Sequence, residues 1–342
     1  MLNVGFTRRR CLNMVELEVS SLKKYFPVQK SFIERLLTRK KQFIRAVDGI
    51  SFKIFSGQVF SLAGESGCGK TTTGRLVVRL EKPDEGKIVF EGKDITFAKE
   101  KELRPLRRKM QIIFQDPYAS LNPRMRIGDA IAEPLIVHGI ADKREAKEEA
   151  LKMLENVGLT PAHMFYKLLP HQLSGGQRQR VAIARAMILK PKFIVADEPV
   201  SMIDVSLRAS ILKLIMKFKS LYNLSILFIT HDLAVARLIS DTIAVMYLGK
   251  IVEIASTEEL IDNPMHPYTK ALLSSVPSLF RRKKEKIILK GEIANPINPP
   301  SGCRLHPRCP FAKSICSKEE PKLVSYGNNH YVACHFPLLG KG

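Results

Sequence analysis

Residues 64–71 constrain this 342-residue chain more than any other segment. They read Gly64, Glu65, Ser66, Gly67, Cys68, Gly69, Lys70 and Thr71, which fits the spacing G-x-x-x-x-G-K-[ST] of a phosphate-binding loop. Glycines allow the backbone N–H groups to turn toward a phosphate, whereas side chains at these positions would block it. We therefore predict that Lys70 reaches the terminal phosphates of a nucleotide and that the Thr71 hydroxyl ligates Mg²⁺.

The segments on either side of this loop support the match. Residues 58–63 read as a buried strand, and residues 72–80, beginning at Thr72, read as a helix. This order places the loop at a helix N-terminus, where the helix dipole favours an anion. A plain glycine-rich turn is the competing interpretation, but lysine and threonine stand at the two positions that phosphate binding requires. We therefore expect residues 64–72 to contact the nucleotide.

Composition and charge restrict the class of protein. Hydrophobic residues make up 45% and charged residues 26% of the chain, as in ordinary globular proteins. No apolar run approaches the roughly 18 residues that span a membrane, so we expect a soluble chain or one peripheral to a membrane built by other chains. The chain has 55 Lys+Arg against 33 Asp+Glu, a net charge of +22. Such an excess is typical of proteins with a polyanionic partner, either nucleic acid or an anionic membrane surface. The basic runs have no interleaved aromatics, so solvated surface is their default interpretation and membrane proximity is the best functional one.

The composition and apolar pattern divide the chain into segments. Residues 1–14 lack the apolar core of a signal peptide and are predicted to be a disordered extension of a cytoplasmic chain. A basic insert at residues 27–45 has apolar residues at helical spacing and predicts an amphipathic helix. Strands and helices alternate over most of the chain, which predicts an α/β fold, with a helical stretch from about residue 117. Proline and glycine become frequent after residue 262.

Two further strands end in polar residues that suit nucleotide hydrolysis. Residues 193–197 form an apolar run that ends in Asp197 and continues with Glu198. Carboxylates at the end of a buried parallel strand are where a phosphate-loop protein holds Mg²⁺ and positions the attacking water, so we assign these roles to Asp197 and Glu198 respectively. A similar strand at residues 225–230 precedes His231. His231 either contacts the γ-phosphate or serves a structural role.

A second candidate phosphate cradle lies about a hundred residues after the first. Residues 173–177 read Leu-Ser-Gly-Gly-Gln and precede a helical run. Ser174, Gly175, Gly176 and Gln177 at a helix N-terminus would bind an anion. One nucleotide hardly needs two cradles from one chain, whereas a nucleotide shared across a dimer interface would explain both.

These motifs together resemble the ATP-binding cassette (ABC) ATPases, because residues 173–177 are similar to the signature that separates this family from other phosphate-loop proteins. The resemblance implies an ABC-type core at residues 15–262, with an inserted helical subdomain at about 117–175. It also implies that two cassettes sandwich ATP between the phosphate loop of one and the signature of the other. By position it assigns roles to Gln115 (Mg²⁺ and the transmembrane partner), His231 (the switch histidine), Asp204 (in the D-loop at 201–204) and Phe26 or its neighbour Tyr25 (adenine stacking).

The D-loop departs from the family pattern. The family usually has Ser-Ala-Leu-Asp, and this chain has Met202 and Ile203 in the middle two positions. Ser201 and Asp204 are kept, so we expect activity to be retained and the coupling across the dimer to differ.

The tail, residues 263–342, resembles the C-terminal extension of oligopeptide/dipeptide importer ATPases, above all their F-type subunit. Members of this group can carry an iron–sulfur cluster on cysteines that match Cys303, Cys309, Cys316 and Cys334. Four thiols crowded in a cytosolic chain indicate a metal, and they suffice for a [4Fe–4S] cluster or for zinc. The absence of a C-x-x-C pair counts against an ordinary zinc finger. Free thiols stay the third alternative.

The resemblance implies an ATP-hydrolysing subunit that powers import of di- or oligopeptides. Implied partners are a paralogous ATPase subunit in a heterodimer, two transmembrane permease subunits and, indirectly, an extracellular substrate-binding protein, at the cytoplasmic face of the membrane and without nucleic acid. Related importers handle oligosaccharides or nickel, which leaves the cargo open. A soluble ABC ATPase acting on nucleic acid or ribosomes is the alternative of another class, but such proteins usually have two fused cassettes or a long coiled-coil insertion.

Overall fold

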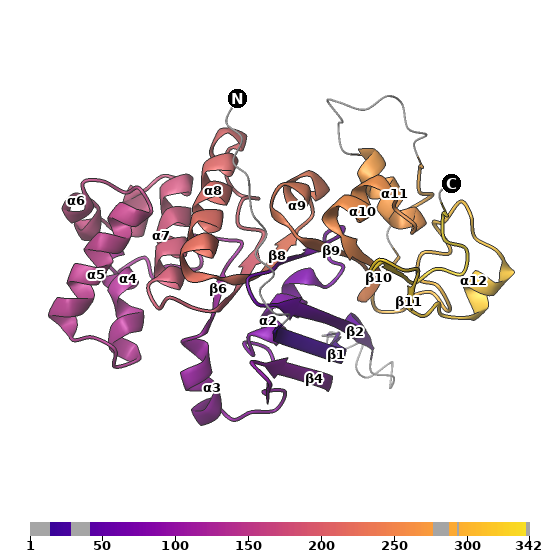
Figure 1. Cartoon of the computed structure of the whole chain (residues 1–342), viewed down its shortest axis with the longest axis horizontal. Coiled ribbons are helices and arrows are strands. Elements are labelled where there is room, and N and C mark those ends of the chain that lie inside the picture. The colour runs from indigo at the N-terminus through magenta and orange to yellow at the C-terminus, as the bar shows by residue number, and fades with distance from the viewer. Residues whose placement is uncertain (1–13, 29–41, 276–286, 293, 340–342) are drawn as a thin grey trace, which may run out of the picture.

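The computed structural model describes residues 14–28, 42–275, 287–292 and 294–339 (Figure 1). Most of the sequence predicted as an N-terminal extension and as an amphipathic insert, residues 1–13 and 29–41, lies outside these ranges. No helix in the described part of the chain is long and apolar enough to cross a membrane.

The larger of two sheets runs through the centre of the molecule. Among the described residues it has the strand order β11–β12–β10–β9–β3–β8–β7–β6. The strands from β9 to β6 are parallel, and β10, β12 and β11 add to one edge in antiparallel fashion. Their bounds are β3 Val59–Ala63, β6 Met110–Ile113, β7 Phe193–Asp197, β8 Ser225–Thr230, β9 Thr242–Tyr247, β10 Lys250–Ser256, β11 Val324–Ser325 and β12 Tyr331–Val332.

The central parallel strands are buried on both faces. Every residue of β3, β7 and β8 is buried, which explains why their sequences are continuous apolar runs and do not alternate. The ends of these strands come together at one edge of the sheet. The phosphate loop follows β3, the acidic pair begins with Asp197 as the last residue of β7, and His231 follows β8.

A smaller antiparallel sheet with the order β2–β1–β4–β5 lies beside the larger one (Figure 1). Its strands are β1 Val15–Pro27, β2 Phe43–Phe55, β4 Glu85–Phe90 and β5 Lys93–Asp94. The strand β1 continues through Tyr25 and Phe26 and pairs with the first residues of β2. Residues 43–45, assigned to the insert from sequence, are therefore part of a strand.

Helices cover both faces of the larger sheet, and one group of them projects from the β6 end (Figure 1). The helices of this group lie in the helical stretch that the sequence predicts from about residue 117. The α/β fold class is also as predicted. The helices are α2 Lys70–Val77, α3 Glu100–Arg107, α4 Ile127–Val137, α5 Lys143–Asn156, α6 Ala162–Lys167, η1 Pro170–Gln172, α7 Gly175–Met187, α8 Val205–Tyr222, α9 Leu233–Ile239, α10 Thr257–Asp262, α11 Pro267–Ser275 and α12 Ser314–Lys318.

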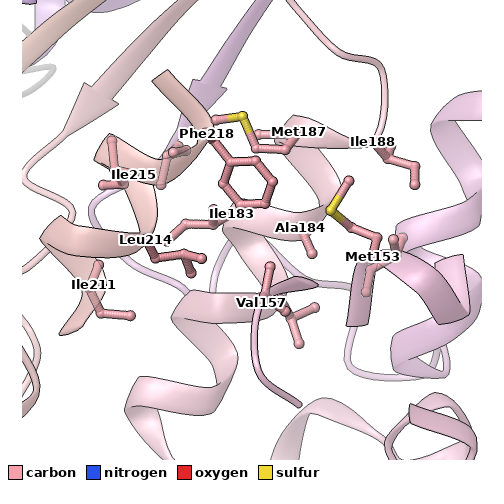
Figure 2. Packing of buried hydrophobic residues seen from close by; sticks show 14 of the residues in the cluster. Met153, Val157, Ile183, Ala184, Met187, Ile188, Ile211, Leu214, Ile215 and Phe218 are labelled. Atoms are coloured by element: carbon pink, nitrogen blue, oxygen red, sulfur yellow. The ribbon is translucent and has the colours of Figure 1, made fainter. Parts of the chain in front are cut away.

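One hydrophobic cluster joins the projecting helices to the sheet. Figure 2 shows Phe218 of α8 between side chains of α7 and α8, with Met153 and Val157 of the α5 region beside them. Full burial of a residue such as Phe218 stabilises the fold by about 2–3 kcal/mol. This packing fixes the first turn of α7, which carries the signature residues, relative to β7.

The C-terminal extension is continuous with the larger sheet. β12 pairs with β10 at Glu253–Val332, and the Ala333 N–H donates to the Val252 carbonyl oxygen at 2.8 Å. A separate hydrophobic cluster combines residues of β9, β10 and α9–α11 with Leu305 of the extension. Within the described residues, the extension therefore shares its hydrophobic core with this end of the larger sheet.

Candidate nucleotide-binding and catalytic site

The glycines of the phosphate loop serve two different purposes. Gly64 (φ +153°) and Gly69 (φ +109°) are packed against protein backbone: a Cβ would lie 2.2 Å from the Met246 carbonyl oxygen and 2.0 Å from the Ala46 carbonyl oxygen respectively. At Gly67 (φ +78°) a Cβ would meet nothing within 4 Å. The prediction that all three glycines clear room for a phosphate is therefore wrong for Gly64 and Gly69, which let the loop approach β9 and β2.

Lys70 is folded back onto its own loop. It is buried, and its Nζ donates to the carbonyl oxygens of Gly64 at 2.8 Å and Glu65 at 2.9 Å. The Cys68 Sγ lies 3.7 Å from the same nitrogen, and burial raises the pKa of this thiol. Cys68 thus faces the protein and not the open side of the loop. A bound phosphate would replace the two carbonyl oxygens as the partner of Lys70.

Thr71 and Asp197 meet beneath the loop. The Thr71 Oγ1 donates to the Asp197 Oδ1 at 3.0 Å, although the two residues are 126 positions apart. Burial raises the pKa of Asp197; the hydrogen bond from Thr71 opposes this rise and the neighbouring Glu198 charge adds to it. A bound cation would offset both the cost of burying the charged Asp197 carboxylate and its repulsion by Glu198. Hydroxyl and carboxylate oxygens are the hard ligands that Mg²⁺ prefers, so the donor set fits this ion.

Glu198 is held by residues from two other segments. Its Oε2 accepts a hydrogen bond from Gln115 Nε2 at 3.2 Å and lies 3.1 Å from His231 Nδ1. The Glu198 backbone has a φ of +43°, and its N–H donates to the Ile229 carbonyl oxygen at 3.0 Å. Left-handed backbone at a non-glycine residue costs on the order of 1–3 kcal/mol and often marks a functional site. Three motifs that are far apart in the sequence therefore share one carboxylate.

The signature residues form the capped start of α7. The Ser174 Oγ accepts from the Gln177 N–H at 3.3 Å, and the Gln177 Oε1 accepts from the Ser174 N–H at 2.9 Å, a reciprocal capping box. A Cβ on Gly175 would meet open space, whereas one on Gly176 would lie 2.9 Å from Leu207 of α8. Ser174 is exposed. The helix N-terminus therefore faces outward with Ser174 at its surface.

Asp204 and Phe26 belong to the start of α8 and the end of β1 respectively. Asp204 is exposed at the start of α8, and its side chain makes no capping bond. Phe26 is half-buried near the end of β1, with Lys24 Nζ 5.2 Å from its ring centre. The neighbouring Tyr25 donates its hydroxyl proton to Asp48. This bond engages only the Tyr25 hydroxyl and not its ring faces, and Arg45 lies over the Tyr25 ring as Lys24 lies over that of Phe26, so adenine stacking by Phe26 or by Tyr25 stays a prediction.

The four cysteines of the extension line one cavity. Cys303, Cys309, Cys316 and Cys334 surround it together with His266, His306, His335 and apolar side chains. They are free thiols, and burial raises the pKa of Cys303 to about 11 and that of Cys334 to about 12. Among the residues that the structure describes, no three histidine, cysteine or acidic side chains are placed to hold one metal ion.

Sequence reasoning missed two residues that contact the phosphate loop from outside. The Tyr268 hydroxyl on α11 accepts the Glu65 N–H at 2.9 Å, and Arg308 in the extension donates to the Glu65 carboxylate at 3.0 Å. They are 203 and 243 positions from Glu65. Neither belongs to a nucleotide motif, so no local pattern could have indicated them.

The strand order and the loop define a phosphate-loop nucleotide-binding protein, and the comparisons narrow the class. Residues 47–201 match the ABC transporter family, and residues 252–316 match the oligopeptide/dipeptide transporter C-terminal region. The chain is 49% identical to the oligopeptide transport ATP-binding protein AppF of Bacillus subtilis, over 93% of this chain and 96% of that protein. It is 46% identical to the dipeptide transport ATP-binding protein DppF of Haemophilus influenzae, over 93% and 95%. The chain belongs to the ABC transporter ATP-binding proteins, which bind and hydrolyse ATP with Mg²⁺.

Solved structures agree with this assignment. A dimer of the ATP-binding cassette MJ0796 with bound ADP and Pi has a TM-score of 0.62 and 28% sequence identity to this chain. It covers 70% of this chain and 98% of its own length. The remainder of the chain is therefore additional to a complete cassette.

Proposed function

We propose that this chain is the ATP-hydrolysing subunit of a transporter that imports di- or oligopeptides. The observation that carries the hydrolytic part is the shared carboxylate of Glu198, which Gln115 and His231 contact beside the Thr71–Asp197 pair. Support for peptides as cargo comes from the matched C-terminal region and from relatives named for oligopeptide and dipeptide transport.

Each residue of the site has a chemical role in this proposal. Lys70 leaves the carbonyl oxygens of its loop and binds the terminal phosphates, with the open face at Gly67 admitting them. Thr71, Asp197 and Gln115 would hold Mg²⁺, which would neutralise negative charge on the phosphates. Glu198 positions the attacking water.

His231 and Gln115 keep the Glu198 carboxylate in one orientation. Both contact the same oxygen, Oε2, which leaves Oε1 able to accept a hydrogen bond from a water molecule. His231 is exposed in the isolated chain, where a partner or a γ-phosphate can reach it. It therefore acts as a sensor of the phosphate and an anchor of Glu198 at the same time.

The signature of this chain serves the nucleotide of a second cassette. Ser174 and the α7 N-terminus are exposed, and Asp204 lies at an exposed helix start nearby in sequence to Glu198. A helix N-terminus with free N–H groups binds a phosphate supplied from outside. We propose a paralogous ATPase subunit as the partner, so that each cassette completes the site of the other.

The remaining partners follow from the transport role. Two permease subunits form the path through the membrane, with this chain bound peripherally at the cytoplasmic face and an extracellular binding protein delivering cargo. The net charge of +22 suits a position near anionic lipid. Nucleic acid is not part of this proposal.

We propose a [4Fe–4S] cluster for the four-cysteine cavity. The donor set fits because four free thiols line one cavity with an apolar shell that includes Leu305, Phe311 and Phe336. Thiolate ligation by Cys303, Cys309, Cys316 and Cys334 would stabilise the extension when the cluster is bound.

The cargo is tested by uptake into vesicles. The chain is assembled with its paralogue, permeases and binding protein, and ATP-driven accumulation of a labelled dipeptide, a labelled oligosaccharide and Ni²⁺ is measured in parallel. We expect accumulation of the peptide alone. Accumulation of the sugar or of nickel without the peptide would contradict the cargo and leave the ATPase assignment intact.

A further inference from the structure

The extension grips the phosphate loop through one bidentate ion pair. Arg308 Nη1 donates to Glu65 Oε2 at 3.0 Å, and Nη2 donates to Oε1 at 3.4 Å. The side chains are only 10% and 27% exposed, so water screens this pair less than a surface pair. The Arg308 guanidinium also donates to the Tyr247 hydroxyl at 3.4 Å. A residue outside the cassette motifs thus fixes a residue inside the loop.

Glu65 contacts both the extension and Lys70. Its carboxylate binds Arg308, its N–H donates to the Tyr268 hydroxyl, and its carbonyl oxygen accepts from Lys70 Nζ. Lys70 must release that carbonyl to bind a phosphate. The position of the Glu65 backbone therefore affects both the shape of the loop and the ease with which Lys70 changes partner.

Arg308 is in turn fixed by the turn that carries two of the cysteines. Its N–H donates to the Leu305 carbonyl oxygen at 2.8 Å, and the next N–H, that of Cys309, donates to the same oxygen at 3.0 Å. The Cys303 N–H donates to the Cys316 carbonyl oxygen at 2.8 Å. Arg308 and Cys309 thus share one carbonyl oxygen as acceptor, which couples the backbone of Cys309 directly to that of Arg308.

A second arginine of the same turn supports this connection. Arg304, next to Cys303, is buried and donates to the Asp48 carboxylate and to the Leu248 carbonyl oxygen. Gly249, the residue after Leu248, donates its N–H to the Cys68 carbonyl oxygen in the phosphate loop at 2.9 Å. The cysteine turn thus touches the surroundings of the loop at two places.

We propose that Arg308 is a positioning residue for the phosphate loop, through which the four-cysteine cavity acts on nucleotide binding. The bidentate pair holds Glu65 in the geometry that binds phosphate, which lowers the cost of ordering the loop. The inference rests on nucleotide binding, which family membership shows, and holds whichever group the cysteines bind.

The test measures the affinity of the full chain for Mg-ATP and Mg-ADP. We expect Arg308→Met to weaken both by roughly fivefold, and Arg308→Lys, which keeps the charge without the fork, to weaken them less. Glu65→Gln should have a similar effect, and the double variant should be no weaker than either single one. Glu320→Gln is the matched control, because it removes another ion pair between extension and cassette, the 2.7 Å pair with Lys250.

Two results would overturn the positioning role. One is Arg308→Met affinity equal to that of Glu320→Gln and the wild type. The other is multiplied losses in the Arg308→Met, Glu65→Gln double variant, which would mean independent actions. In the assembled ATPase, Arg308→Met should raise KM with kcat nearly unchanged, because it removes binding and not a transition-state contact. A folding defect would instead lower the fraction of active protein, which active-site titration measures.

The link to the cysteines is tested by Cys309→Ser in two backgrounds. We expect this change to weaken Mg-ADP binding in the wild type and to have no further effect on Arg308→Met. An equal loss in both backgrounds, or no loss in the wild type, would overturn the link. All these assays use the isolated chain or its ATPase activity, so failure of peptide uptake would question the cargo and leave this result standing.

Discussion

Gly67 and Gly69 show how one motif combines two physical requirements. Both have positive φ, but Gly69 lies against backbone of β2 and Gly67 faces open space. Backbone atoms cannot yield to a new methyl group as a flexible side chain can. The two glycines should therefore respond differently to the same substitution.

We predict that Gly69→Ala destabilises the protein by about 3 kcal/mol or more, because its Cβ would clash with the Ala46 carbonyl oxygen in addition to the left-handed strain. Gly67→Ala should cost only about 1 kcal/mol of strain, keep the fold and weaken ATP binding. Urea unfolding of the nucleotide-free chain measures the first effect and nucleotide titration the second. Equal stability losses for the two variants would contradict the distinction.

His266 should make the stability of the protein depend on pH. It is buried, and its Nδ1 accepts the backbone N–H of Tyr268 at 3.2 Å. The backbone N–H of His266 donates to the Glu253 carboxylate at 3.1 Å. Burial lowers the pKa of His266 to about 4, although the Glu253 charge opposes this. The unfolded chain binds a proton at His266 more readily than the folded protein does. The contribution of His266 to stability is therefore complete above pH 6.5 and is lost as the pH falls toward 4.

We predict that His266→Asn, which offers an acceptor that does not titrate, flattens this loss. The wild type should lose up to about 3 kcal/mol more than the variant between pH 7 and pH 4.5. Urea unfolding of both proteins across this range isolates His266 from the other histidines. Parallel pH profiles would show that another group is responsible.

At the scale of single elements, the start of α7 separates binding from turnover. Ser174→Ala removes the capping bond to Gln177 and should cost about 1 kcal/mol of stability. We predict unchanged nucleotide affinity in the isolated chain and a roughly tenfold or greater loss of ATP turnover in the assembled transporter, because the signature serves the partner's nucleotide.

Ser256→Ala is the matched control for this prediction. Ser256 caps α10 in the same way, accepting the Glu259 N–H at 3.4 Å, and belongs to no nucleotide motif. It should lower stability by a similar amount and leave turnover unchanged. A loss of nucleotide affinity on Ser174→Ala in the isolated chain would mean that the signature acts within its own chain.

Most elements were predictable from sequence because their apolar pattern is local. The strands at Phe193–Asp197 and Ser225–Thr230 follow continuous apolar runs, and the helix at Lys143–Asn156 follows helical spacing with a capping box at Asp142. Boundaries were less accurate. The helix after the loop begins at Lys70 and not at residue 72, and β1 continues through Phe26, because cross-strand pairing with β2 is not visible in a local pattern.

At the scale of the whole molecule, the extension is the part that sequence described least well. Its cysteines were identifiable by their crowding, yet its contacts with the cassette were not. Arg308 and Glu65 are 243 positions apart, and Arg304 and Asp48 are 256 apart. Such pairs depend on the sheet order that brings β12 beside β10, which no motif encodes.

We predict that protein purified without oxygen is brown and has about four iron and four sulfide ions per chain. Cys316→Ser should lose the colour and lower the melting temperature of the protein, because metal binding contributes to folding. Visible absorbance, iron and sulfide analysis and thermal unfolding check these outcomes. Colourless protein with one zinc per chain would contradict the cluster, and the assignment of the nucleotide site would stand.

The central claim is that ATP hydrolysis at Glu198 drives peptide import. The most direct measurement is the rate of ATP hydrolysis by the assembled transporter in vesicles, with and without peptide-loaded binding protein. We predict that peptide stimulates the wild type and that Glu198→Gln lowers the rate at least a hundredfold while ATP still binds. Glu258→Gln, an exposed carboxylate on α10, should behave as the wild type. Retained hydrolysis in Glu198→Gln, or a rate that ignores the loaded binding protein, would contradict the claim.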